Sequence, residues 1–277
     1  MDDVMPTSVA AIQMCSGPDR EANLSVAETL IAEAAGLGAN LISLPENFSF
    51  LGRPEEKLAE AEDPERSHVL DFLRDQAQRR RAYVIGGSIP IRTEDPKRVS
   101  NSCFALDPHG EIVARYDKMH LFDVSIDEEN TFRESDHVRP GNETVVFEAA
   151  GIKVGLSICF DIRFPELYRR LSFAGAHLVF VPSAFTVPTG RAHWDVLLRA
   201  RAIENLCYVA APAQIGEHIP GRKSYGKSMI VDPWGTVVAV APDRPSVISA
   251  ELDADLLTRI RNRLPALDRR RNDVFPP

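Results

Sequence analysis

The chain has 277 residues, of which 44% are hydrophobic and 26% are charged, which is the composition of an ordinary globular protein. Its formal net charge of -8 argues against a general nucleic-acid-binding protein. The run Arg269-Arg270-Arg271 is locally basic, and we interpret it as solvated surface.

Strand-like and helix-like segments alternate in the first part of the chain. In order, the pattern predicts a strand at residues 8–14, a helix at 21–37, a strand at 41–44, a helix at 69–81 and a strand at 83–90. Two hairpins are expected next, the first at residues 102–107 and 111–116 and the second at 144–148 and 152–158.

The alternation returns after the second hairpin. The pattern predicts a helix at 165–174, a strand at 178–181, a helix at 193–205, a strand at 207–213, a meander at 228–232, 236–240 and 247–252, and a last helix at 254–263. Parallel-type units combined with hairpins indicate mixed sheets covered by helices. We therefore expect one α/β domain over residues 1–277, with two sheets face to face, helices outside, and a tail at 264–277.

Cys159 is the most informative residue of the chain. It follows a predicted buried strand and precedes a helix that we expect to begin at Pro165. A thiol between a strand end and a helix N-terminus is expected to be exposed, rigidly held and biased toward the thiolate, which suits a nucleophile. The position also fits a structural thiol, and the residues alone leave that alternative open.

Two charged residues also stand just past predicted strands, namely Glu46 and Lys118. Sites in α/β sheets gather beyond the carboxyl ends of strands, so Glu46, Lys118 and Cys159 form a candidate catalytic set. Glu46 is suited to take the thiol proton, and Lys118 and the backbone N–H of Phe160 are suited to stabilise an oxyanion. Glu134 is a candidate for orienting Lys118 or the substrate.

Each of these residues has a structural alternative. Glu46 could cap a helix or loop, Lys118 could lie on the surface, and Glu134 could be an ordinary loop carboxylate. A dyad of Cys159 and His120 is a second catalytic possibility.

A further group of residues is suited to binding an anion or a carboxylate. Phe185 and Thr186 lie between a predicted strand and a predicted helix, where helix N–H groups are donors, although a simple helix cap is the alternative. The guanidinium of Arg163 suits a substrate carboxylate, or else a salt bridge with Asp161 or Glu166.

Three segments resemble the catalytic blocks of the nitrilase superfamily of carbon–nitrogen hydrolases. They are LPE at residues 44–46, YDKMHLF at 116–122 and SICFDIRFPE at 157–166. Further segments resemble the deaminated glutathione amidase branch, namely AHWDVLLRARAIE at 192–204, SYG at 224–226 and VDPWGTVVA at 231–239. The resemblance extends over nearly the whole chain, and the omega-amidase branch is the nearest sibling.

This resemblance implies an α-β-β-α sandwich, usually assembled as a homodimer or a higher homo-oligomer. It implies Cys159 as the nucleophile, Glu46 as general base and acid, and Lys118 at the oxyanion. Glu134 matches the second glutamate of the family. Phe160 stands where relatives usually carry tyrosine, but it retains the backbone N–H of the oxyanion site.

The resemblance also implies the substrate, a small-molecule amide of a 2-oxo acid. Arg163 matches a position suited to the 2-oxo acid end, and Phe185 and Thr186 match a loop that lines the pocket. Deaminated glutathione would yield 2-oxoglutarate and cysteinylglycine, without a metal or other cofactor. The alternatives are an omega-amidase acting on 2-oxoglutaramate, a promiscuous short-chain amidase, or a non-catalytic partner-binding protein on the same scaffold. Lys227 stands where close relatives often carry histidine.

The cellular location is also suggested by the sequence. The four cysteines form no CxxC pair and no zinc-type cluster with histidine, which is typical of a reduced protein without a structural metal. No run reaches the ~18 apolar residues of a membrane span, and the first residues lack a secretory signal pattern. We therefore expect a cytoplasmic protein that binds neither membranes nor nucleic acid.

Overall fold

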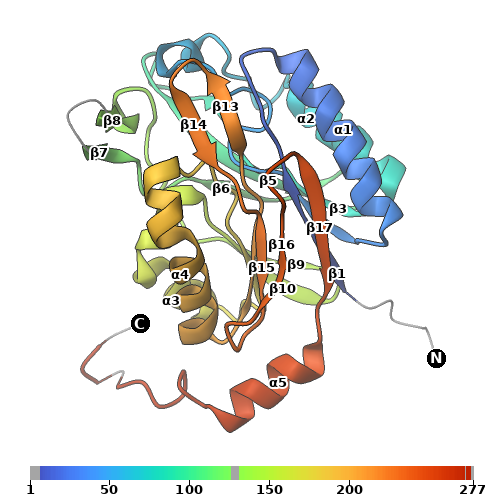
Figure 1. The fold of residues 1–277 in the computed structure, drawn as a ribbon, viewed down its shortest axis with the longest axis vertical. Coiled ribbons are helices and arrows are strands. Elements are labelled where there is room, and N and C mark those ends of the chain that lie inside the picture. The colour runs from blue at the N-terminus through green and yellow to red at the C-terminus, as the bar shows by residue number, and fades with distance from the viewer. Residues whose placement is uncertain (1–6, 126–130, 272, 276–277) are drawn as a thin grey trace.

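The computed structural model describes residues 7–125, 131–271 and 273–275. Two mixed β-sheets pack face to face, with α1 and α2 on one outer side and α3 and α4 on the other (Figure 1). This arrangement confirms the predicted four-layer α-β-β-α sandwich. Parts of the predicted domain and tail, at residues 1–6, 126–130, 272 and 276–277, lie outside the described residues.

Among the described residues, the first sheet has seven strands. In spatial order they are β17 (Ser246–Glu251), β1 (Ser8–Gln13), β2 (Leu41–Ser43), β3 (Tyr83–Ile85), β5 (Val99–Leu106) and β4 (Ile89–Arg92), with β6 (Ile112–Asp117) paired to β5. The parallel strands β1, β2 and β3 are connected through α1 (Arg20–Gly36) and α2 (His68–Arg80). β5 and β6 form the first predicted hairpin.

The second sheet has six strands in the part of the chain that the structure describes. In spatial order they are β16 (Val237–Val240), β15 (Met229–Val231), β12 (Tyr208–Ala211), β11 (Leu178–Phe180), β10 (Ile152–Leu156) and β9 (Val146–Ala149). α3 (Pro165–Phe173) and α4 (Val187–Asn205) connect its parallel strands. Two hairpins stand apart, β7 (Asp123–Ser125) with β8 (Thr131–Arg133) and β13 (Ile215–Ile219) with β14 (Arg222–Tyr225).

The predicted meander is wrong in its last strand. β15 and β16 pair in the second sheet as expected, but β17 leaves them and pairs antiparallel with β1 of the first sheet. This pairing satisfies the backbone groups along one side of β1, which would otherwise form an open sheet edge. The chain therefore passes from one sheet to the other near its end.

Side-chain alternation along β1 separates two layers of the core. Ala10 and Ile12 are fully buried and join the cluster that contains Ile31 of α1. Val9 and Ala11 are also fully buried, but they belong to the cluster between the sheets. Because successive side chains of a strand point to opposite faces, one short apolar strand serves both layers.

A tight backbone contact shapes the turn beside the predicted site. The single strand expected at 83–90 is divided into β3 and β4, and Gly87 between them has a φ of +52°. A Cβ atom there would clash with the carbonyl oxygens of Leu44 and Pro45. Glycine is therefore required, both for the left-handed backbone and for the close approach of the segment that carries Glu46.

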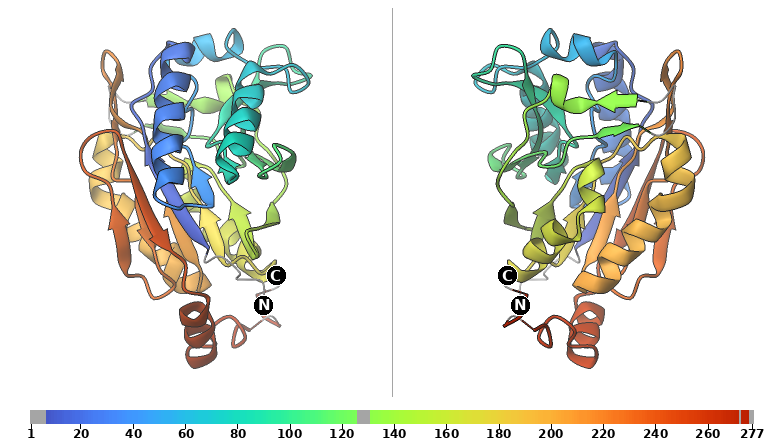
Figure 2. Two further views of the ribbon diagram at one scale, coloured as in Figure 1. Left: turned by 90° about the vertical axis from the view of Figure 1, so that its right-hand side faces the viewer. Right: turned by 90° about the vertical axis from the view of Figure 1, so that its left-hand side faces the viewer.

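The two ends of the sandwich differ. The β13–β14 hairpin projects from one end, and α5 (Ala254–Arg263) with the C-terminal segment lies at the other (Figures 1 and 2). α4 begins at Val187, earlier than predicted, because Pro188 is tolerated in a first helical turn. None of the described helices is both long enough and apolar enough to span a bilayer.

Candidate active site

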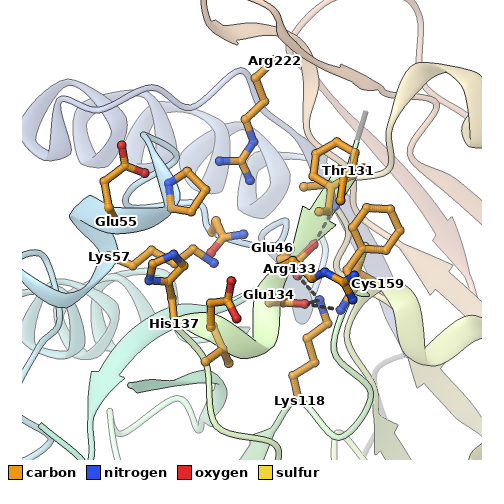
Figure 3. A pocket seen from close by; sticks show the side chains of 17 residues that line it. Glu46, Glu55, Lys57, Lys118, Thr131, Arg133, Glu134, His137, Cys159 and Arg222 are labelled. Carbon is orange, nitrogen blue, oxygen red and sulfur yellow. Dashed lines mark hydrogen bonds and ion pairs between the residues drawn. The ribbon is translucent and has the colours of Figure 1, made fainter. Parts of the chain in front are cut away.

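The predicted catalytic side chains meet where strands of both sheets end. Glu46 follows β2 and Lys118 follows β6 of the first sheet, whereas Cys159 follows β10 of the second. Figure 3 shows their side chains around one pocket. All three are buried, with exposed fractions of 3%, 2% and 6%. The alternative of a surface lysine is therefore wrong for Lys118, because its side chain is almost fully buried.

Lys118 is held between two carboxylates. Its Nζ lies 2.9 Å from Glu46 Oε1 and 2.8 Å from Glu134 Oε2. Burial by itself would lower the pKa of Lys118, but Glu134 and Glu46 raise it well above its usual value. Lys118 therefore remains an ammonium ion at neutral pH.

The two glutamates have different surroundings. Glu134, the first residue of the 3-10 helix η2 (Glu134–Asp136), also accepts a hydrogen bond from the backbone N–H of Phe122 at 2.7 Å. Burial would raise the pKa of Glu134, but the ammonium groups of Lys118 and Lys57 lower it to about 2. Glu134 is thus a permanent anion that keeps Lys118 in place.

Glu46 is fixed at both of its carboxylate oxygens. Asn101 Nδ2 donates to Oε1 at 3.1 Å, and the backbone N–H of Ala184 donates to Oε2 at 2.9 Å. Gln214 Nε2 donates to the Glu46 carbonyl oxygen at 3.0 Å. The sequence analysis missed Asn101 and Gln214, and their only signal was a polar residue next to buried apolar positions.

Cys159 has an unusual backbone conformation. It is the first residue of the 3-10 helix η3 (Cys159–Arg163), with a φ of +49°. A left-handed backbone is uncommon outside glycine, and such conformations gather at functional sites. The Cys159 N–H donates to the carbonyl oxygen of Pro182 at 2.9 Å, which holds the backbone in this geometry.

The expectation of an exposed, readily ionised thiol is wrong. Burial and the carboxylate of Glu46 raise the pKa of Cys159 well above its usual value, although Lys118 and the N–H of Ala184 act in the opposite direction. The sulfur is therefore a thiol at neutral pH, and it needs a base before it can attack. Glu46 is the carboxylate that acts on it most strongly.

The surroundings of Cys159 also contain an unused hydrogen-bond donor. The backbone N–H of Phe160 has no acceptor among the described residues. It directly follows Cys159 in the chain, where an oxyanion donor for a thiol nucleophile would lie. The oxyanion role of Phe160 stays a prediction.

Arg163 stacks on aromatic rings instead of forming the predicted salt bridge. Its guanidinium lies 5.6 Å from the ring centroid of Phe160 and 5.3 Å from that of Phe185, and Nη1 is 3.3 Å from His193 Nδ1. The structure shows no ion pair from Arg163 to Asp161 or another described carboxylate, so the salt-bridge alternative is wrong. Stacking on two rings keeps the cation beside the site.

The Cys159–His120 dyad is not formed. His120 Nδ1 lies 2.7 Å from Asp161 Oδ1, and the imidazole stacks on Phe164 with centroids 3.7 Å apart. Asp161 also accepts from Tyr116 Oη at 2.6 Å. His120 thus belongs to a buried structural network.

Cys159 lies where two cavities meet. The larger has a volume of about 280 Å³ and contains Glu46, Lys118 and Glu134. The smaller is lined by side chains that include Phe160, Phe185, Thr186 and Thr189. Phe185 and Thr186 therefore line a cavity beside the sulfur, as expected for the pocket loop. Lys227 forms an ion pair, with its Nζ 2.8 Å from Asp243 Oδ1.

The larger cavity also contains cations that the sequence analysis missed. Lys57 and Arg222 line it, and both lie in segments without a predicted element. A lysine in a loop and an arginine in an unrecognised hairpin are not distinctive in a sequence.

Among the described residues, no group of three histidine, cysteine or acidic side chains could hold a metal ion.

Comparison with known proteins places this arrangement in a family. The carbon-nitrogen hydrolase family model matches residues 8–262. The chain is 44% identical over 268 residues to "Deaminated glutathione amidase" of Synechocystis sp. (strain PCC 6803 / GT-S), covering 96% of this chain and 98% of that relative.

Solved structures agree with the family model. Saccharomyces cerevisiae Nit3, a member of branch 10 of the nitrilase superfamily, has a TM-score of 0.87 at 31% identity, covering 96% of each chain. An amidase from Nesterenkonia sp. AN1 has a TM-score of 0.80 at 27% identity, covering 97% of this chain and 95% of that chain. In that structure the acetamide moiety of fluoroacetamide is covalently attached at the active-site cysteine. Because the family model spans most of the chain and the structural matches run nearly end to end, this protein belongs to the carbon-nitrogen hydrolase family of the nitrilase superfamily.

Proposed function

We propose that this protein is a cysteine-dependent amidase that hydrolyses deaminated glutathione to 2-oxoglutarate and cysteinylglycine. The observation that carries the proposal is the buried set of Glu46, Lys118 and Cys159 at the wall of one cavity. The Synechocystis relative with this name supports the substrate, and the cysteine adduct of the Nesterenkonia amidase supports the chemistry.

The first half of the reaction forms a thioester. Glu46 takes the proton of the Cys159 thiol, and the sulfur attacks the carbonyl carbon of the amide. Lys118 and the Phe160 N–H stabilise the negative charge that develops on the former carbonyl oxygen. Glu46 then gives its proton to the departing amine, so the C–N bond breaks and cysteinylglycine leaves.

The second half restores the enzyme. Glu46 takes a proton from water, whose oxygen attacks the thioester carbon, and the C–S bond breaks. The thiolate of Cys159 recovers its proton from Glu46, and 2-oxoglutarate is released. Glu134 does not exchange protons in this scheme, because its low pKa keeps it ionised beside Lys118.

We assign the acyl end of the substrate to the smaller cavity, whose volume of about 20 Å³ must widen through side-chain movement to admit a 2-oxo acid. Arg163 supplies a cation for the 2-oxo acid carboxylate, and Thr186 supplies a hydroxyl, whereas Phe185 provides an apolar wall. The stacking of Arg163 on Phe160 and Phe185 is consistent with a guanidinium that swings over the rings to meet a carboxylate.

Replacement of the nucleophile tests the mechanism. Cys159→Ala should lower kcat by a factor on the order of 10⁴ or more, because no other group forms the thioester. Release of 2-oxoglutarate and of cysteinylglycine is measured separately. The control is Cys15→Ala, since Cys15 is an exposed cysteine outside the cavities. Unchanged turnover in Cys159→Ala would refute the mechanism.

The substrate is tested by a comparison of two amides. We expect kcat/KM for deaminated glutathione to exceed that for 2-oxoglutaramate by about tenfold or more, or about 1.4 kcal/mol in the barrier. The reverse preference would identify an omega-amidase with the same chemistry. Absence of turnover for every 2-oxo acid amide would favour the non-catalytic, partner-binding alternative.

We also propose that the protein is a cytoplasmic homodimer or higher homo-oligomer. The location is supported by Cys15, Cys103, Cys159 and Cys207, all of which are free thiols. Self-association is supported by exposed apolar side chains, and it is tested below at the scale of the whole molecule.

A further inference from the structure

The position of Cys159 between two cavities divides a bound amide into two parts. Both cavities are lined by Phe122, Cys159 and Ala184, so they share the wall that carries the sulfur. An amide carbon attacked by that sulfur has its acyl chain on one side and its amine on the other. The acyl chain and the amine therefore extend into different cavities.

The larger cavity suits the amine part. In the proposed substrate this part is a dipeptide with its own carboxylate, whereas the acyl part is a short 2-oxo acid. The larger cavity, of about 280 Å³, has room for the bulkier half, whereas the smaller one, of about 20 Å³, has to widen even for the acyl chain. Arg163 already supplies a cation beside the smaller cavity, so the acyl carboxylate has a partner there.

Two cations stand at the far side of the larger cavity. Lys57 belongs to the 3-10 helix η1 (Pro54–Leu58), and Arg222 is the first residue of β14. In Figure 3 both side chains lie away from Cys159, across the cavity from it. They come from segments far apart in the sequence, which only the folded chain brings to one cavity.

These cations are unusual because their charge is not balanced. Lys57 is 8% exposed, yet its ammonium group makes no hydrogen bond and no ion pair with any described residue. Arg222 donates from Nη1 to the Gly52 carbonyl oxygen at 2.7 Å, and the other N–H groups of its guanidinium have no acceptor among the described residues. A buried cation without a partner is costly, so such groups normally meet a counter-ion.

Lys118 provides the contrast within the same cavity. It is equally buried, but it pairs with Glu46 and Glu134. Burial lowers the pKa of Lys57, and Arg222 lowers it further, although Glu134 acts in the opposite direction. An anion between Lys57 and Arg222 would relieve both the burial and the repulsion.

The acidic residues of the cavity do not supply that anion. Glu55 and Asp136 also line it, but neither forms an ion pair with Lys57 or Arg222. The position opposite the sulfur therefore has the charge and the donors for an external carboxylate.

We propose that Lys57 and Arg222 form a subsite for the carboxylate of the amine half of the substrate, which in deaminated glutathione is the terminal glycine carboxylate. This subsite rests on the proposed function, because it takes the amide to be attacked at Cys159. It makes the enzyme selective for amides whose leaving amine ends in a negative charge. Lys57 and Arg222 bind the substrate and take no part in bond breaking.

Kinetics on three compounds test the subsite. They are deaminated glutathione, its analogue with a neutral glycinamide end, and 2-oxoglutaramate, which has no extension. We expect Lys57→Met and Arg222→Gln to lower kcat/KM for the first compound by about ten- to hundredfold, mainly through KM. The other two compounds should change by less than about threefold, and Lys57→Arg should restore most of the activity lost in Lys57→Met.

A matched control comes from the same hairpin. Lys223 follows Arg222 but is exposed and pairs with Glu217 outside the cavity, so Lys223→Met removes a neighbouring charge without touching the subsite. It should leave all three compounds unaffected. Equal losses on all three compounds in Lys57→Met and Arg222→Gln would overturn the subsite, because the two residues would then support folding or chemistry.

Binding separates the subsite from the proposed activity. In Cys159→Ala, titration calorimetry should show at least about tenfold tighter binding of the free acid than of the glycinamide analogue, and adding Lys57→Met should abolish the difference. Equal affinities would refute the subsite even if the enzyme cleaves deaminated glutathione. A large difference would support it even if wild-type turnover proves to be poor, which would count only against the proposed function.

Discussion

At the scale of single residues, the site depends on one lysine shared by two glutamates with different tasks. Glu134 has a pKa of about 2 and acts as a fixed anion. Glu46 is the carboxylate directed at the thiol, and its second oxygen is held by the N–H of Ala184. Two carboxylates with unlike surroundings can thus divide structural and proton-transfer roles.

The fixed charge of Glu134 predicts that the stability of the protein depends on pH in the acidic range. Its pKa is about 2 in the folded protein and 4.5 ordinarily, so its contribution is complete above pH 4.5 and is lost as the pH falls toward 2. Glu134→Gln should cost about 3 kcal/mol at pH 7, because it leaves Lys118 with one carboxylate. Urea unfolding of both proteins across this pH range measures the difference.

The same variant has a kinetic readout. Lys118 without Glu134 is less firmly held, so kcat should fall while KM changes less. The control is Glu33→Gln, which removes an acidic side chain from α1 on the outer side of the first sheet. Parallel stability curves for wild type and Glu134→Gln between pH 4.5 and pH 2 would contradict the assigned role.

At the scale of elements, the β13–β14 hairpin depends on a neutral histidine. His218 Nδ1 lies 2.7 Å from the Ser16 carbonyl oxygen, and Nε2 lies 2.8 Å from Ser224 Oγ. A carbonyl oxygen only accepts, so Nδ1 carries the proton and Nε2 accepts from the hydroxyl. The hairpin that carries Arg222 is therefore fastened to the rest of the molecule by an uncharged imidazole.

This histidine predicts that acid loosens the hairpin. Burial lowers the pKa of His218 from 6.5 to about 4, so its contribution is complete above pH 6.5 and is lost as the pH falls to 4. The loss should reach roughly 3 kcal/mol relative to His218→Gln, which does not titrate. Unfolding free energies and hydrogen exchange of residues 215–225 measure it. The control is His109→Gln, at an exposed turn, which should behave like wild type. If His218→Gln lost stability with falling pH just as wild type does, the titration of His218 would not be the cause.

At the scale of the whole molecule, an apolar face on α4 is open in the single chain. Val196 and Ile203 are 64% and 43% exposed and stand seven residues apart, on one side of the helix. Trp234 is 62% exposed, and Arg199 donates to the neighbouring Gly235 carbonyl oxygen at 2.8 Å, which holds that turn against α4. Exposed apolar side chains gathered on neighbouring segments in this way are typical of an interface.

This face predicts where copies of the chain associate. Val196→Glu should reduce the mass in light scattering from a multiple of 30.7 kDa to 30.7 kDa, with an unchanged circular dichroism spectrum. Val26→Glu is the matched control, because Val26 is 43% exposed on α1, on the other side of the sandwich. A wild-type monomer, or an oligomer that survives Val196→Glu, would argue against this interface.

The single-domain organisation of residues 1–277 stays a prediction.

Sequence reasoning succeeded where the signal is local. Alternating apolar residues predicted most strands and helices. The position after a strand singled out Glu46, Lys118 and Cys159, which line one cavity in the structure, and their catalytic roles stay predictions. It failed where distant segments decide the outcome. β17 follows β16 in the chain, yet it pairs with β1, because the open edge of β1 lies beside it only in the folded molecule.

The sequence by itself determined the fold class, the family and the identity of the candidate nucleophile, since periodicity and short motifs are properties of neighbouring residues. Only the tertiary structure decided that Cys159 is a buried thiol with a raised pKa, and that His120 serves Asp161. It alone brought Lys57 and Arg222 to one cavity. The burial of a side chain depends on which distant segments pack together, and its burial shifts its pKa and so sets its charge. A local sequence pattern does not encode that packing.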